Sequence, residues 1–205
     1  IDLCVTPEHR FPYTNRETPD IVRWASAEEL SHKLTSHKYA LVAPRRWEGV
    51  EPTNLPYNMD PILYAEFLGW WMADGHVEKG TNRVTVVQKK PAPDLEMVMN
   101  AVAAAAGASL RTKAGFAFSD AILAEHLRTF GPKHGGGRRV PDSIRFASPA
   151  VIWAFLMAYT RGDGHIRAPR RGTAHEEHTI WFASRELAGQ FQDLAQKVGW
   201  GSALR

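Results

Sequence analysis

Two stretches of the chain carry one pattern of residues, and this pattern decides the fold. Residues 65–77 read AEFLGWWMADGHV, and residues 153–166 read WAFLMAYTRGDGHI. Each stretch opens with an apolar run at helical spacing and continues with Asp, Gly, His and a β-branched residue in that order. Repetition of a segment within one chain indicates a fold built from related units. We therefore expect two halves that each begin with a helix.

Small residues four positions apart predict how the two helices meet. The first helix carries Gly69 and Ala73, and the second carries Ala158 and Gly162. Residues four apart lie on the same face of a helix, and small side chains let two backbones approach closely. We expect these two faces to pack against each other.

The Asp-Gly pair is expected to end each helix, with Gly75 and Gly164 in the left-handed conformation that commonly terminates helices. Asp74 and Asp163 then lie at helix C-termini, where the helix dipole disfavours a carboxylate. If the two helix ends meet, a divalent cation bound by carboxylate and carbonyl oxygens would stabilise them. The alternative is a pair of ordinary core helices that each end in an Asp-Gly turn.

Together the two segments resemble the two motifs of LAGLIDADG homing endonucleases. Residues 67–75 keep the Gly, Ala, Asp and Gly of that motif, and residues 156–164 keep its leading Leu and final Asp-Gly. The resemblance implies that the last acid of each motif, Asp74 or Asp163, binds catalytic metal. It also implies a long asymmetric target in double-stranded DNA and cuts that leave short 3′ overhangs.

The same resemblance implies a metal site and a cofactor. The positions that it assigns to metal binding are Asp74, Asp163, Ala73 and Gly162. The implied cofactor is Mg²⁺, and Mn²⁺ or Ca²⁺ are expected to replace it for binding. The aspartates are then metal ligands rather than general bases, and the metal activates water and stabilises the attacking and leaving oxygens.

For the whole chain, the resemblance implies an α+β fold of two pseudo-symmetric αββαββα half-units, whose strands form a saddle-shaped DNA-binding surface. We expect the first half-unit at residues 53–147 and the second at residues 148–205, within one monomeric chain. The second half-unit looks incomplete, because only 42 residues follow Asp163. Residues 1–52 are expected to form a separate N-terminal segment and a linker.

Turn residues and alternation predict the elements after the first motif. We expect a hairpin that turns at residues 80–82 and continues as a strand over residues 83–89. A helix capped by Asp94 follows, then a second hairpin that turns at Gly115, and then a helix over residues 121–130. After the second motif, the corresponding elements are expected to be two strands and a helix, at residues 165–170, 179–184 and 186–198.

Strand alternation is expected to turn one polar face of each hairpin toward DNA. In the strand over residues 83–89, Arg83 and Thr85 share one face, and Val84 and Val86 share the other. The candidate DNA-binding residues are His76, Arg83, Thr85, Lys89, Lys90, Arg111, Lys113, Arg139, His165, Arg167, Arg170, Arg171 and Thr179. The alternatives are an ordinary solvated surface for the basic residues and a zinc site for the two histidines.

Two further residues are candidates for the catalytic site. The family often carries a Gln on the strand after the motif, and Gln88 matches it, whereas Ser184 looks equivalent in the second half. Arg138 stands where the family usually has a Lys, behind the glycines at 135–137. Arg does not act as a base, so Arg138 is expected to stabilise phosphate charge. A polar strand end for Gln88, a DNA-backbone contact for Arg138, and Lys133 in its place are the alternatives.

The N-terminal segment carries a different resemblance. Residues 5–10 read VTPEHR and resemble the Thr-x-x-His block of intein splicing domains, in which Thr6 and His9 would activate a peptide bond. Residues 24–30 resemble the segment that follows this block. The alternative is an ordinary turn with a surface histidine. Neither end of the chain carries the nucleophile or the Asn that splicing needs, so we expect a splicing-domain (Hint) remnant that does not splice alone.

Composition permits these interpretations without demonstrating them. The net charge of +3 is compatible with a nucleic-acid partner. A single cysteine, Cys4, excludes a disulfide framework and suits a reducing cytoplasm, and no apolar stretch is long enough to cross a membrane. We expect an intracellular, nucleoid-associated homing endonuclease from an intein, in a bacterial or phage context. The alternatives are a non-cleaving DNA-binding regulator, an RNA maturase and a protein-splicing domain.

Overall fold

The computed structural model describes residues 10–33, 38–41, 47–88, 92–112, 115–132, 137–168, 176–182 and 184–200. These residues form an α+β protein with small antiparallel sheets, as expected from the sequence. The chain divides into two compact units, Ile1–Arg46 and Trp47–Arg205. Both copies of the repeated motif lie in the second unit. Among the described helices, none combines the length and the apolar character that a membrane crossing requires.

The N-terminal unit contains a three-stranded antiparallel sheet of order β2-β1-β3 and one short helix. Its elements are β1 (Arg10–Asn15), β2 (Thr18–Ser26), α1 (Ala27–Lys33) and β3 (Tyr39–Leu41). Ser26 and Glu29 form a capping box at the start of α1. The Ser26 Oγ accepts the Glu29 N–H, and the Glu29 carboxylate accepts the Ser26 N–H. The splicing-motif candidates Thr6 and His9 lie outside the described residues.

The second unit contains the two motif helices, α2 (Pro61–Asp74) and α6 (Pro149–Asp163). The elements that go with α2 are η1 (Pro56–Asn58), β4 (Gly75–Val77), β5 (Arg83–Val86), α3 (Pro93–Ala105), β6 (Phe116–Ser119) and α4 (Ala121–Arg128). A short helix, α5 (Asp142–Arg145), precedes α6. The elements that follow α6 are β7 (Gly164–Arg167), β8 (Glu177–Ile180) and α7 (Arg185–Lys197).

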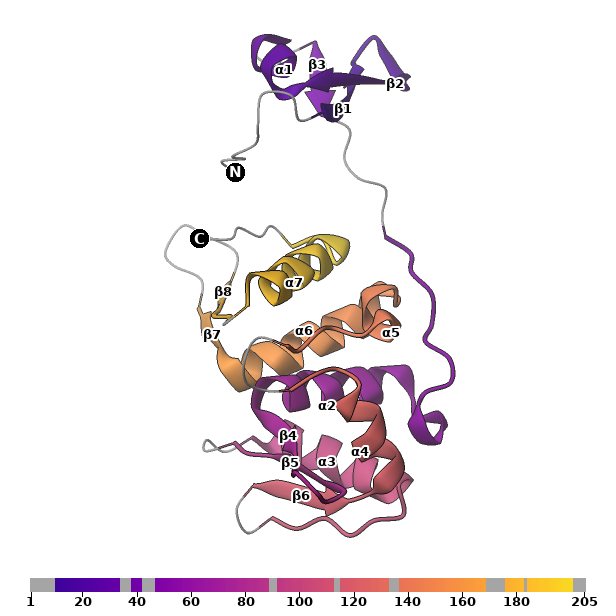
Figure 1. Cartoon of the computed structure of the whole chain (residues 1–205). Helices are drawn as coiled ribbons and strands as arrows, with labels where there is room; N and C mark the ends of the chain where they lie inside the picture. Colours follow the sequence, from indigo (N-terminus) through magenta and orange to yellow (C-terminus); the bar gives the residue numbers. More distant parts are fainter. Residues whose placement is uncertain are drawn as a thin grey trace. The chain divides into compact units, whose positions relative to one another are not determined.

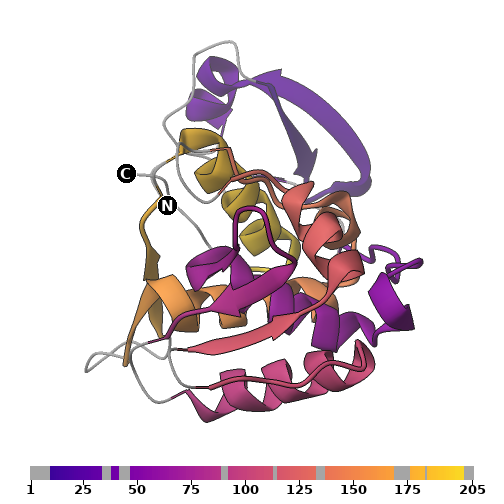
Figure 2. The same cartoon turned by 60° about the horizontal axis from the view of Figure 1, so that its bottom comes forward.

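The two motif helices lie side by side in the middle of the second unit (Figure 1). The β4–β5–β6 sheet and helices α3 and α4 lie on the side of α2 away from α6, and α7 covers the other side of α6. Figure 2 shows α3 along the outer edge of this unit, beside β6. The core between the layers includes large, fully buried side chains from both helices, among them Phe67, Trp71 and Phe155.

Side chains at the helix N-termini explain where the helices begin. Asp60 accepts the N–H groups of Ile62 and Leu63 at 2.9 and 3.0 Å, and Pro61 occupies the first position of α2. Asp120 caps α4 in the same way, by accepting the Leu123 N–H at 2.7 Å. These bonds satisfy N–H groups that have no partner within the helix.

The predicted cap of α3 is wrong. Asp94 lies in the first turn rather than before it, because Pro93 takes the first helical position and Ala92 becomes the capping residue. The Asp94 carboxylate instead forms an ion pair with Arg161 of α6 at 2.9 Å. An exposed carboxylate that was expected to act locally therefore connects α3 to the second motif helix.

A two-stranded hairpin follows each motif helix, as the sequence predicts. In β4–β5, Gly75 pairs with Val86 and His76 with Thr85. The second hairpin repeats this register, with Gly164 paired with Ile180 and His165 with Thr179. The two motifs are therefore followed by equivalent strand pairs, in which the histidine after each Asp-Gly faces a threonine on the neighbouring strand.

Other strand boundaries differ from the expectation. β5 ends at Val86 rather than near residue 89, and β8 covers Glu177–Ile180 rather than residues 179–184. β8 ends early because Ser184 is used to cap α7, where its Oγ accepts the Leu187 N–H at 3.4 Å. On either side of Gly115, which has a positive φ of 105°, Arg111 and Ala117 pair antiparallel through two backbone hydrogen bonds, as expected for a hairpin, while residues 113–114 lie outside the described residues.

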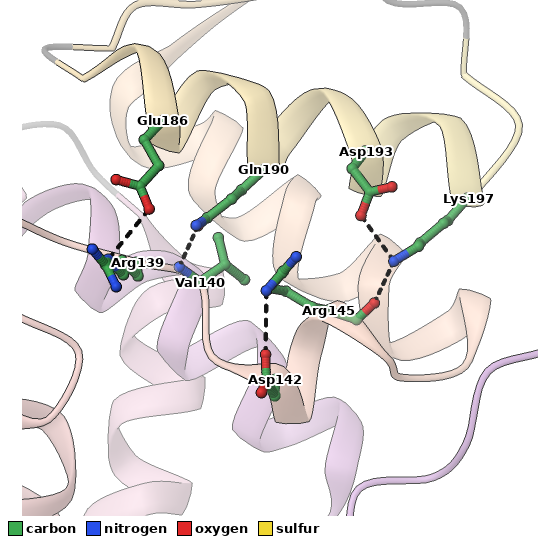
Figure 3. Close-up of polar contacts among 8 residues, drawn as sticks. All are labelled: Arg139, Val140, Asp142, Arg145, Glu186, Gln190, Asp193 and Lys197. Carbon is green, nitrogen blue, oxygen red and sulfur yellow. Dashed lines mark hydrogen bonds and ion pairs between the residues drawn. The ribbon is translucent and has the colours of Figure 1, made fainter.

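Helix α7 is held against the segment that connects the two halves (Figure 3). The side-chain Oε1 of Gln190 accepts the Val140 N–H at 2.8 Å, and Glu186 pairs with Arg139 at 3.3 Å. At the other end of α7, the Lys197 ammonium bonds Asp193 at 2.8 Å and donates to the Arg145 carbonyl at 2.7 Å. These contacts fix the path of the connection into the second motif helix.

Candidate functional site

The small residues predicted to lie between the motif helices do lie between them. A Cβ added to Gly69 would come within 2.5 Å of the Phe155 carbonyl oxygen and 2.8 Å of the Ala158 Cβ. A Cβ added to Gly162 would come within 2.6 Å of the Ala73 Cβ. Because the earlier residue of α2 meets the earlier residue of α6, and the later meets the later, the two helices run parallel. Both C-termini therefore lie at the same end of the pair.

The glycines after the two aspartates do not have the predicted left-handed conformation. Gly75 has φ −94° and Gly164 has φ −111°, so both are extended. The chain passes directly from helix to strand at each position, which requires extended backbone. Glycine is needed there for space instead, because a Cβ would come within 2.4 Å of the Trp71 ring at Gly75 and within 2.6 Å of the Thr160 carbonyl oxygen at Gly164.

The carboxylate of Asp74 receives a hydrogen bond from the segment that follows β5. Gln88 Nε2 donates to Asp74 Oδ2 at 3.4 Å, and the Val87 N–H donates to the Asp74 carbonyl at 3.2 Å. Asp74 is half-buried, whereas Asp163 is exposed. The structure thus brings together Asp74 and Gln88, two of the four residues that the sequence nominates for catalysis.

Tyr159 is a buried residue one turn before the end of α6, and sequence reasoning missed it. Burial raises the pKa of the Tyr159 hydroxyl, the nearby Asp163 charge raises it further, and Asp74 adds to this while Arg138 opposes it. Both carboxylates therefore act on one buried hydroxyl, as expected if they lie near each other. The signal was present in the sequence, because Tyr159 precedes Asp163 by four residues and shares its helix face.

Arg138, expected to reach phosphate from a flexible arm, is instead buried behind the site. Its side chain is only 6% exposed. Its guanidinium donates to the carbonyls of Trp71 at 3.1 Å and of Met72 and Gly75 at 2.7 Å, and it lies 4.1 Å from the Trp71 ring centroid. Burial lowers the pKa of Arg138 to about 10, so the group remains a cation at neutral pH.

A cavity of about 690 Å³ opens beside the C-terminus of α2. Its polar lining comes from Asp74, His76, Arg128 and Arg138, and its apolar lining includes Trp71. The carboxylate of the first motif therefore borders a space large enough for a group of a bound molecule.

The second half carries Phe182 at the position that corresponds to Gln88. In the first half, Val86 pairs with Gly75, and Gln88 lies two residues after Val86. In the second half, Ile180 pairs with Gly164, and the residue two positions after Ile180 is Phe182. Ser184, proposed from the sequence as the counterpart, caps α7. Phe182 stacks on Tyr159 with ring centroids 5.9 Å apart. The two halves therefore differ in chemistry beside their aspartates.

The predicted DNA-binding residues fall into distinct groups. Arg83, Arg139 and Arg167 form ion pairs with acidic neighbours, at 3.3, 3.3 and 3.8 Å. His165 and Arg111 are exposed, and His76 and Thr179 are half-buried. Thr85 is buried, and its hydroxyl is shielded from solvent, so it does not present a surface to DNA as expected. Those that lie outside the described residues are Lys89, Lys90, Lys113, Arg170 and Arg171.

The donor chemistry at the helix ends fits a hard divalent cation. Carboxylates from Asp74 and Asp163 and backbone carbonyls at the ends of parallel helices are oxygen donors, the kind that Mg²⁺ and Ca²⁺ take. Mg²⁺ is usually held by only one or two carboxylates, with waters and substrate phosphates completing its ligands. Within the described part of the chain there is no group of three or more His, Cys, Asp or Glu side chains placed to hold a metal by themselves.

Comparison of the sequence with models of known protein families found no match, and a search of curated proteins found no relative.

Proposed function

We propose that this chain is a site-specific DNA endonuclease of the LAGLIDADG type, which hydrolyses phosphodiester bonds in both strands with a divalent metal, most naturally Mg²⁺. The observation that carries the proposal is the parallel packing of α2 on α6 through Gly69 and Gly162, which brings the ends with Asp74 and Asp163 to one side. Two repeated sequence motifs and a repeated strand register support it.

In this proposal, the chain's own residues prepare the site for a cation and a phosphate. Asp74 and Asp163 would hold the metal, with the carbonyls of Ala73 and Gly162 as further donors. The metal, when bound, would lower the pKa of a water and stabilise charge on the attacking and leaving oxygens. Gln88 keeps the Asp74 carboxylate in place through its hydrogen bond. The deep packing of both helices keeps the two helix ends that carry the carboxylates in place.

Binding of the duplex is proposed to use the β4–β5–β6 and β7–β8 strands, because strands and their side chains can read base edges in the major groove. Basic side chains at their ends, such as Arg83 and Arg167, would contact phosphates and make affinity dependent on salt. We further propose that the chain acts as a monomer with two unequal halves. The N-terminal unit is proposed to derive from an intein splicing domain, on the sequence of residues 5–10 and 24–30.

The test uses the full chain and an unbiased DNA pool. The purified protein is incubated with fragmented bacterial genomic DNA and random-sequence duplexes in Mg²⁺, and new ends are captured by adapter ligation and sequenced. We expect recurrent paired ends with short 3′ overhangs at one long sequence, and none when EDTA is present. Absence of recurrent ends together with retained DNA binding in Ca²⁺ would replace the proposal with a non-cleaving regulator. Preferential binding of structured RNA would replace it with a maturase.

A further inference from the structure

The C-terminal end of helix α2 contacts the guanidinium of Arg138, which comes from a distant part of the chain. The last carbonyls of a helix have no partner within it and carry partial negative charge. Arg138 donates to three carbonyls at this end, those of Trp71, Met72 and Gly75, over distances of 2.7 to 3.1 Å. The planar guanidinium can satisfy several acceptors at once, which a lysine ammonium does less well in a fixed geometry.

These bonds lie along the backbone on both sides of Asp74, the residue whose carboxylate belongs to the proposed metal site. Asp74 is the last residue of α2, and Arg138 holds the peptide carbonyls of Met72 before it and Gly75 after it. Gln88 contacts the Asp74 carboxylate itself. Arg138 and Gln88 therefore restrain the same residue, one through the backbone and one through the side chain.

The burial of Arg138 favours a supporting role for this residue over a direct contact with phosphate. The Arg138 side chain is 6% exposed, and its Nε is shielded from solvent without a hydrogen-bond partner. Its guanidinium also lies over the Trp71 ring. To reach a DNA backbone, it would have to leave three carbonyls and the ring. Arg138 also lines the cavity beside Asp74, but its hydrogen bonds go to main-chain carbonyls around that residue, so it acts on the backbone that carries the carboxylate.

The other motif helix has no such support within the described residues. The carbonyls that correspond to those of Trp71, Met72 and Gly75 belong to Thr160, Arg161 and Gly164, and no described side chain donates to them. Among the described residues, the contacts that Arg138 makes with the carbonyls at the end of α2 are therefore not repeated at the end of α6. The two halves also differ at the position of Gln88, where the second half carries Phe182.

We propose that Arg138 is a positioning residue, which fixes the end of α2 so that Asp74 is held ready for metal, and that it does not contact DNA. This inference depends on the proposed nuclease function. The sequence resemblance suggested that Arg138 acts on phosphate. We assign it instead to hydrogen bonds with main-chain carbonyls inside the protein.

The test compares Arg138→Lys with Arg145→Lys, an Arg→Lys change on α5 outside the site. The substrate is the duplex recovered by end capture. Two quantities are measured: the single-turnover cleavage rate at saturating DNA and Mg²⁺, and the DNA affinity in Ca²⁺ over a salt series. Arg138→Lys should slow cleavage about tenfold or more, as losing a partner of a metal ligand does. Its DNA affinity and salt dependence should match those of the wild type, and Arg145→Lys should match the wild type throughout.

Other outcomes overturn the proposal in recognisable ways. A normal cleavage rate, with weaker DNA binding and a salt slope reduced by about 0.9, would make Arg138 a phosphate contact. A normal rate, affinity and slope, with a lowered melting temperature, would make it a purely structural residue. If Arg138→Lys does not fold, Arg138→Gln is measured in the same way, and failure of both to fold assigns Arg138 to core stability instead. Absence of cleavage by the wild type would refute the nuclease proposal itself, whereas equal cleavage by wild type and Arg138→Lys refutes only this inference.

Discussion

Gly69 of α2 faces Ala158 of α6 so closely that a Cβ at Gly69 would lie 2.8 Å from the Ala158 Cβ. The same Cβ would lie 2.5 Å from the Phe155 carbonyl oxygen, which is backbone and cannot rotate away. The distance between the two proposed metal-binding ends is therefore set by two helix backbones in contact.

Gly69→Ala should destabilise the second unit. Overpacking a tight core contact costs about 1–3 kcal/mol, and the melting temperature should fall by several degrees in a thermal unfolding experiment. Gly189→Ala in α7 is the matched control, because nothing lies within 4 Å of a Cβ there. That control should be neutral or stabilise by about 0.5–1 kcal/mol, since alanine favours helix over glycine. Equal melting temperatures for Gly69→Ala and wild type would show that the helix contact is loose.

Asp74→Asn and Asp163→Asn should each abolish double-strand cleavage in Mg²⁺ and leave DNA binding in Ca²⁺ largely intact. Each change removes a charged metal ligand while keeping the side-chain shape, and hard cations prefer carboxylate oxygens. The measurement is plasmid linearisation on the recovered target. Asp142→Asn on the exposed surface of α5 is the control and should cut normally. Wild-type cutting by either motif variant would refute the metal-ligand roles.

Gln88→Ala should slow cleavage by about 10-fold to 100-fold, the usual effect of losing a hydrogen-bond partner of a metal ligand. The physical reason is the 3.4 Å hydrogen bond from Gln88 Nε2 to Asp74 Oδ2, which restricts the carboxylate. The rate is measured under single-turnover conditions across a Mg²⁺ titration. Gln196→Ala, at an exposed position of α7, serves as the control. A rate equal to that of the wild type would indicate that Gln88 is only a polar strand-end residue.

Stability should fall as the pH drops below about 6.5, and His126 should contribute to this loss. Burial lowers the pKa of His126, whose Nε2 lies 2.8 Å from the Tyr64 hydroxyl. The folded state therefore binds fewer protons here than the unfolded state, so stability is complete above the unfolded pKa of 6.5 and decreases as the pH falls through it. His126→Gln should flatten the pH dependence of urea midpoints, and a pH dependence equal to that of the wild type would argue against this contribution.

Lys197→Met should weaken the attachment of α7. The Lys197 ammonium donates to the Arg145 carbonyl, pairs with Asp193 and lies 4.3 Å from the Trp47 ring centroid. Losing a charged hydrogen bond costs about 1.5–3 kcal/mol. By contrast, Glu186→Gln breaks an exposed pair with Arg139 and should cost under about 1 kcal/mol. Both are measured by chemical unfolding followed by tryptophan fluorescence, and equal effects would argue against a special role for Lys197.

Several features of the fold and site were predictable from the sequence because they depend on local spacing. The four-residue separation of Gly69 from Ala73 and of Ala158 from Gly162 identified the helix contact correctly. Gln88 was nominated from its place after the strand that follows the motif, and the structure places its amide within hydrogen-bond distance of Asp74, while its catalytic role stays a prediction. By contrast, Tyr159 was missed, although it lies one helical turn before Asp163, because its importance comes from the partner helix as well as its own.

By itself, the sequence determined the two repeated helices, their shared packing face and the strands that follow them. Each of these depends on residues close together in the chain, whose periodicity and turn chemistry set local structure. Only the tertiary structure decided what surrounds the two aspartates. Arg138 lies far from Trp71 and Gly75 in sequence, and nothing in its own segment indicates that its guanidinium is buried against their carbonyls. Burial and long-range hydrogen bonds arise only when distant segments pack together. Tertiary packing therefore decided that the Arg138 guanidinium lies against the backbone at Asp74 and that other charges remain on the surface.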